Sequence, residues 1–142
     1  MNRGAAILAA GVTALVITGA ALAAKPVTGS SQSNSIKLVM LADDGARAAA
    51  GAQPTFGDQV TYEVSTAATN EPYVETSCFQ NRTLVSKQSR GFFDGYYAGT
   101  RVFTLGPTSL WQGGAATCQA RLVMWVNGNA KTLASMSFDV AG

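Results

Sequence analysis

The chain has 142 residues, enough for one domain of ordinary size, and 13% of them are charged against a hydrophobic fraction of 47%. It contains no histidine, which removes the commonest general base, the imidazole metal ligand and the usual pH switch. The formal net charge of +2 comes from scattered Lys and Arg residues, so no nucleic-acid partner is expected.

The first 23 residues are predicted to be a secretory signal peptide. Arg3 supplies the basic start, residues 5–22 are uncharged and mostly apolar, and the small residues Ala21 and Ala23 suit cleavage after Ala23. We therefore expect a secreted or cell-envelope protein. The alternative is that residues 5–22 stay uncleaved as an anchor, since a bilayer is spanned by about 20 apolar residues. Membrane association is expected only in that case.

Export also bears on the two cysteines, Cys78 and Cys118, which both fall inside predicted strands. In an oxidising compartment such a pair is expected to form a disulfide. Closing a loop of about 40 residues restricts the unfolded chain, which is worth roughly 3–4 kcal/mol in the chain-entropy model. A redox or metal role would need a CxxC pair or further ligands, and the sequence has neither. No metal or other cofactor is expected.

The N-terminal part of the exported chain combines a spacer, a strand and a loop. Residues 24–35 are polar and rich in Ser, which predicts a flexible spacer. Residues 36–41 form the first predicted strand, and the Gly- and Ala-rich residues 43–53 favour a loop.

The clearest strand follows at residues 58–66, where Val60, Tyr62 and Val64 alternate with polar residues. Further strands are predicted at residues 73–80, 83–88, 100–105, 116–127 and 131–140. Asn81-Arg82 is expected to form a tight turn. Asn127-Gly128-Asn129 is expected to form a hairpin turn, because Asn and Gly accept a positive φ at little cost.

The longest predicted strand, residues 116–127, has two distinct faces. The inward-facing set includes Met124 and Val126, and the outward-facing set includes Val123 and Trp125. Seven short strands with turns between them predict an all-β fold, an antiparallel sandwich of two sheets over residues 36–142, after a cleavable N-terminal hydrophobic helix.

One stretch resembles a known family. Residues 54–64 (PTFGDQVTYEV) are similar to the entry to the second strand in immunoglobulin-like domains of bacterial surface proteins. Residues 54–140, including GFFDGY at 91–96 and GGAATC at 113–118, also resemble small secreted proteins of actinobacteria without an assigned function. The resemblance implies an immunoglobulin-like sandwich that serves as a module.

The chain departs from antibody-type domains at two positions. Phe92 replaces the expected Trp after Cys78, and Ala116 replaces the Tyr of a tyrosine corner. If Cys78 lies on the third strand, the resemblance implies that Cys118 is its neighbour in the same sheet.

No catalytic site is expected. Glu63 and Glu75 would approach the carboxylate spacing of retaining glycosidases if their strands formed a hairpin. In an immunoglobulin-like topology, however, these strands belong to different sheets and the two glutamates never meet.

A binding surface is expected at aromatic residues of two predicted loops, because loops at the end of a rigid sandwich commonly bind partners. The candidates are Phe92, Phe93, Asp94, Tyr96, Tyr97 and Trp111. Alternatively, Phe92 and Phe93 close the end of the core and Asp94 merely forms a turn.

Trp125, facing outward beside Val123, is a further candidate contact residue. The N-terminal segment or the first strand could instead cover it.

These features predict a non-catalytic binding or structural module, whose partner is a protein or glycan of the cell envelope. One alternative is a subunit of a surface assembly that associates through its outer sheet face. The other is a small hydrolase using exposed carboxylates, which the absence of His disfavours.

Overall fold

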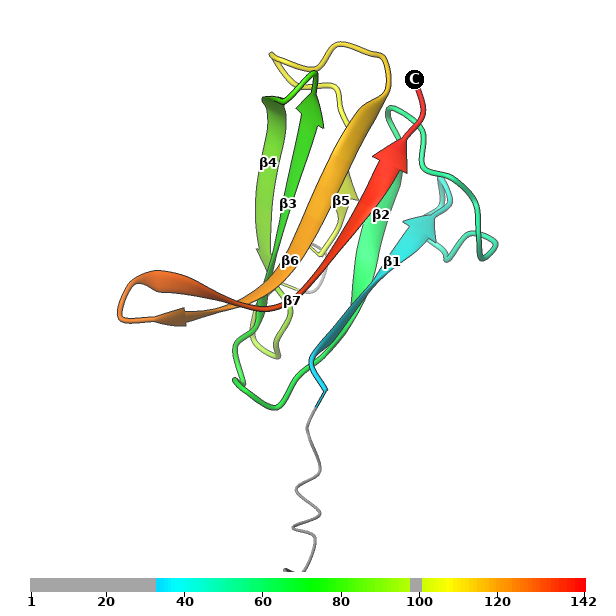
Figure 1. Cartoon of the computed structure of the whole chain (residues 1–142). Helices are drawn as coiled ribbons and strands as arrows, with labels where there is room; N and C mark the ends of the chain where they lie inside the picture. The colour runs from blue at the N-terminus through cyan, green and yellow to red at the C-terminus, as the bar shows by residue number, and fades with distance from the viewer. Residues whose placement is uncertain (1–32, 98–100) are drawn as a thin grey trace, which may run out of the picture. The chain divides into compact units, whose positions relative to one another are not determined.

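The computed structural model describes residues 33–97 and 101–142, so the predicted signal peptide and most of the predicted spacer lie outside the described residues. The described part is a sandwich of two antiparallel sheets with no helix (Figure 1). One sheet has the order β1-β2-β5, and the other has the order β4-β3-β6-β7. The strands are β1 (Ser35–Leu41), β2 (Gln59–Ser65), β3 (Tyr73–Gln80), β4 (Thr83–Gly91), β5 (Phe103–Thr104), β6 (Ala116–Val126) and β7 (Asn129–Val140). This arrangement is consistent with an immunoglobulin-like fold.

The core lies between the two sheets and follows the predicted alternation. Val60 and Tyr62 of β2 are buried against residues of the opposite sheet, among them Val74 of β3 and Leu122 of β6. The residues that alternate with them, Gln59, Thr61 and Glu63, point outward, because successive side chains of a strand face opposite sides.

Side-chain hydrogen bonds connect the two sheets and the loops that join them. The Tyr62 hydroxyl lies 2.8 Å from Thr76 Oγ1, and both residues are buried. Burial raises the pKa of the Tyr62 phenol well above its ordinary value. Near the edge strand β4, Gln88 Nε2 donates to the Thr104 carbonyl at 2.8 Å and Thr108 Oγ1 donates to the Val85 carbonyl at 2.7 Å.

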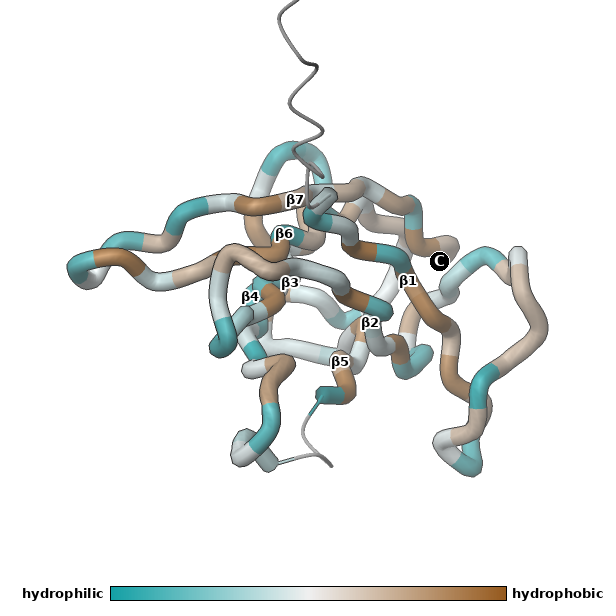
Figure 2. Tube along the Cα trace, turned by 90° about the horizontal axis from the view of Figure 1, so that it is seen from below, coloured by the Kyte–Doolittle hydropathy of each residue, from teal (hydrophilic) through white to brown (hydrophobic). Residues whose placement is uncertain are grey.

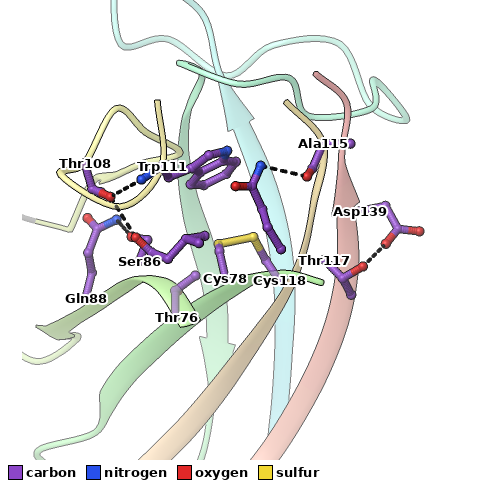
Figure 3. Close-up of a disulfide and its surroundings, with 12 residues drawn as sticks. Thr76, Cys78, Ser86, Gln88, Thr108, Trp111, Ala115, Thr117, Cys118 and Asp139 are labelled. Atoms are coloured by element: carbon purple, nitrogen blue, oxygen red, sulfur yellow. Dashed lines mark hydrogen bonds between the residues drawn. A yellow bond between two sulfur atoms is a disulfide. The ribbon is translucent and has the colours of Figure 1, made fainter. Parts of the chain in front are cut away.

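The predicted disulfide is confirmed and lies within one sheet. Cys78 and Cys118 are register partners on β3 and β6, with Cα atoms 4.0 Å apart, and both side chains are buried (Figure 3). Cys78 does lie on the third strand, and its partner is then a neighbour in the same sheet, as expected for that case.

The seven predicted strands and both tight turns are confirmed, with adjustments at strand ends. Asn81 and Arg82 have positive φ, as do Asn127 and Gly128. β4 continues past the predicted end at residue 88, because Ser89, Arg90 and Gly91 still pair with β3. β5 is shorter than predicted and contains two residues.

The end of the β6–β7 hairpin, residues 124–132, extends away from the rest of the sandwich (Figure 1). We call it the β6–β7 arm. The prediction that Met124 and Val126 lie in the interior holds only in part, because Met124 is half-buried but Val126 is 40% exposed on the projecting arm. A register shift after Leu122 leaves Leu133 without a partner on β6, and such bulges bend and twist a strand. Figure 2 shows hydrophobic positions on the arm, well away from the other strands.

Candidate functional site

The outer face of the four-stranded sheet is organised by register across its strands. Gly91, Tyr73, Val123 and Thr132 form one row across β4, β3, β6 and β7. In the next row Glu75 and Arg121 lie side by side on β3 and β6. Tyr73, Glu75, Arg121 and Val123 alternate with core positions, so their side chains point to the outer face. Thr132 joins the row through the register shift in β7.

Tyr73 is the centre of an aromatic group on this face. Its ring centroid lies 5.5 Å from that of Phe93, 6.0 Å from that of Tyr96 and 6.5 Å from that of Trp125. Each of these pairs is edge-to-face, a favourable arrangement for ring quadrupoles. We call Tyr73, Phe93, Tyr96 and Trp125 the outer aromatic cluster.

Gly91 makes room for this cluster. A Cβ atom at Gly91 would lie 2.6 Å from the Tyr96 ring and 2.7 Å from the Phe93 ring, which is closer than real Cβ contacts. The chain then reverses at Gly95, whose φ of 90° is left-handed, and the Tyr96 amide donates to the Phe93 carbonyl at 3.3 Å. The glycines in the GFFDGY stretch therefore place two aromatic rings over Tyr73.

The cluster is partly exposed and covers one apolar residue. Trp125 is 51% exposed, and the neighbouring Tyr97 is 82% exposed. Val123 does face outward as predicted, but it is fully buried rather than part of a contact surface. It pairs with Tyr73 in register, two residues before Trp125 on the same face, so these rings account for its burial.

An ion pair lies in the outward-facing row next to that of Tyr73 and Val123. Arg121 Nη2 donates to Glu75 Oε2, and Glu75 is buried while Arg121 is partly exposed. With its partner beside it, this carboxylate is a structural counter-ion rather than an unpaired acid.

The two glutamates considered as a catalytic pair lie in different sheets. Glu63 is on the outer side of β2, where it binds Arg47 and lies 3.9 Å from Lys37 Nζ. The Arg47 guanidinium lowers the pKa of Glu63. Glu75 faces outward from the opposite sheet, so the hairpin that would have paired the two carboxylates does not exist.

The remaining predicted surface residues separate into two groups. Phe92 and Trp111 are buried in the core: Phe92 packs on Tyr62 and Phe103, and Trp111 packs on Phe56. The Trp111 indole N–H donates to the Gly114 carbonyl at 3.0 Å (Trp111 is labelled in Figure 3). Asp94, in contrast, is exposed beside the cluster.

The structure therefore brings together Phe93, Tyr96 and Trp125, from the loop after β4 and from β6. Sequence reasoning missed Tyr73, the residue that joins them. The parity argument that placed Trp125 outward applies equally to Tyr73, because it alternates with the buried Val74, Thr76 and Cys78.

The described residues include no group of three or more Asp, Glu or Cys side chains placed to hold a metal ion. The same residues contain no helix of sufficient length and hydrophobicity to cross a membrane. Comparison with protein-family models, with curated proteins and with solved structures finds no significant match to this chain.

Proposed function

We propose that this protein is a secreted or cell-envelope binding module of the bacterial immunoglobulin-like type, and that the outer aromatic cluster binds a protein or glycan of the envelope. The observation that carries the proposal is Trp125, half exposed on a folded strand and held edge-to-face by Tyr73. Exposed aromatic rings held in place by packing bind partners at low entropic cost, since their side chains are already ordered.

Two further features support export. The N-terminal residues have the composition of a signal peptide, and the buried Cys78–Cys118 disulfide suits an oxidising compartment. The full chain expressed in a bacterial host should yield a soluble species that begins at Ala24. Its intact mass without reduction should be two hydrogens below that of the dithiol. A full-length species recovered from the membrane fraction would instead identify residues 5–22 as an anchor.

Binding is tested by sedimentation of the exported protein with isolated cell envelopes. We expect Trp125→Ser to lower the bound fraction at least about tenfold, as expected when a central interface aromatic is lost. Leu110→Ser is the matched control, because Leu110 is a 68% exposed apolar residue in the loop between β5 and β6, outside the outer aromatic cluster. Equal binding by wild type and Trp125→Ser would rule out the outer aromatic cluster as the binding surface. Protease-treated envelopes then distinguish a protein partner from a glycan.

A second candidate function is self-association in a surface assembly, and the β6–β7 arm favours it. Trp125 and Val126 are 51% and 40% exposed on opposite faces of this projecting hairpin. Sedimentation velocity should then show an oligomer that Trp125→Ser dissociates. An unchanged distribution of species would exclude association through this residue.

A further inference from the structure

A groove lies beside β1, the edge strand of the three-stranded sheet, and is separate from the outer aromatic cluster. It has a volume of about 330 Å³ and runs between residues 37–40 of β1 and the loop at residues 47–52. The loop is held against β1 at one end. There Arg47 and Leu41 form an isolated antiparallel β-bridge, and the Ala48 amide donates to the Met40 carbonyl at 2.9 Å. Beyond Ala48 the loop side chains are very small, which leaves the groove open.

The two parts of the groove differ in chemistry. Its length is apolar and runs between residues 38–40 of β1 and the alanine-rich loop. Leu38 and Met40 also pack against the core, so Val39 is the β1 side chain that shares a face with Lys37. The polar part of the groove contains Lys37, Arg47 and Glu63. Lys37 and Glu63 are register partners on β1 and β2, and Arg47 binds the same carboxylate.

The charges at the polar part do not cancel. Two cations share one carboxylate, which leaves one positive charge beside an apolar channel. The pKa of Glu63 is lowered, chiefly by its hydrogen bond from Arg47, so this carboxylate is ionised at neutral pH. A ligand that supplies a second carboxylate would satisfy the remaining charge.

We propose that this groove binds a medium-chain fatty acid. The alkyl chain lies between β1 and the alanine-rich loop, and the carboxylate binds Arg47 and Lys37 in competition with Glu63. The volume is at the lower end of the range for small-molecule sites, which favours a medium-length alkyl chain over a long one. This site is independent of the proposed envelope-binding function.

The first test is a chain-length series of hexanoate, octanoate, decanoate and dodecanoate, each below its micelle concentration, titrated into the exported protein by calorimetry. Affinity should rise about fourfold for each buried methylene and stop rising once the groove is filled. Decyltrimethylammonium, which has a cationic head, should bind at least about tenfold more weakly than decanoate. An affinity that keeps rising to dodecanoate, or one indifferent to the head group, overturns the proposal.

Three variants test the assigned roles. Glu63→Gln should tighten decanoate binding because it removes the competing carboxylate, and Arg47→Gln should weaken it. Ala50→Phe should block the groove for every chain length, and its exposed position makes a folding defect unexpected. Leu110→Ser and Trp125→Ser should bind decanoate as wild type does. Thermal unfolding of each variant shows that it is folded, and wild-type binding by Ala50→Phe would place the ligand elsewhere.

Discussion

Tyr62 joins the two sheets through a buried hydrogen bond to Thr76 at 2.8 Å. Tyr62→Phe removes the hydroxyl and leaves the Thr76 oxygen without this partner in the core. We expect the free energy of unfolding to fall by about 1–2 kcal/mol, the usual range for a buried hydrogen bond. Urea denaturation followed by circular dichroism measures the change. Leu110→Ser, at a 68% exposed position, is the control and should be close to neutral.

The same tyrosine predicts a loss of stability in alkali. Its folded-state pKa is raised above the ordinary value of 10.0 by burial, so the folded chain holds this proton where the unfolded chain releases it. The contribution is present in full below pH 10 and is lost as pH rises above that value toward the folded-state pKa. Urea denaturation at neutral pH and above pH 10 should show this decline in wild type and a smaller decline in Tyr62→Phe. Equal declines would contradict the assignment.

Gly91 sets the position of the outer aromatic cluster. Gly91→Ala puts a methyl group 2.6 Å from the Tyr96 ring, so Tyr96 and Phe93 must move away from Tyr73. We expect a destabilisation of about 1–3 kcal/mol, the usual cost of overpacking, together with stronger iodide quenching of Trp125 fluorescence. Ser89→Ala, on the same strand, should change neither quantity. The core residue Trp111 should stay protected from iodide in all these proteins.

At the scale of elements, the β6–β7 arm is supported by the packing of Trp125 on Tyr73. A free two-stranded ribbon is marginally stable in water, so the packing of Trp125 on Tyr73 should maintain the arm. Trp125→Ser should increase amide hydrogen exchange at residues 124–132 and leave exchange in β3 unchanged. Faster exchange throughout the sheet would mean that the residue supports the whole fold.

Alternation along the sequence predicted most strands, because residues two apart share a face whatever lies beyond it. It placed Tyr62 inward and Trp125 outward correctly. It gave the wrong exposure for Val123 and Val126, because alternation gives the direction of a side chain and not what covers it. Aromatic rings cover Val123, and no opposite sheet covers Val126.

The candidate site was predicted in part. GFFDGY and Trp125 were recognised separately, but their meeting depends on the register between β3, β4 and β6, and this register passes through Tyr73. Phe92 and Phe93 are adjacent in sequence and face opposite ways, one into the core and the other toward Tyr73. Composition alone could not assign their sides.

At the scale of the whole molecule, the disulfide restricts unfolding more than it shapes the native sheet. Cys78 and Cys118 already sit opposite each other in a ladder, so the Cys78→Ala/Cys118→Ala double variant should keep the same β-sheet content. Its free energy of unfolding should fall by roughly 3–4 kcal/mol, as the chain-entropy model gives for a loop of this length. Urea denaturation of wild type with and without reductant checks the value. A native-state spectrum that changes in the double variant would show that the bond also shapes the sheet.

The position of this bond also limits how far the protein can be stretched. If the chain is pulled from both ends, the 40-residue separation between Cys78 and Cys118 cannot lengthen while the bond is intact. At about 3.3–3.6 Å per extended residue, the intact bond shortens the maximum extension of the chain by about 130–145 Å. The loop closed by the disulfide contains strand β4 and the aromatic residues Phe92, Phe93, Tyr96 and Trp111. Mechanical tension would therefore pass through β3 and β6 at the bond and bypass the loop that carries most of the aromatic side chains.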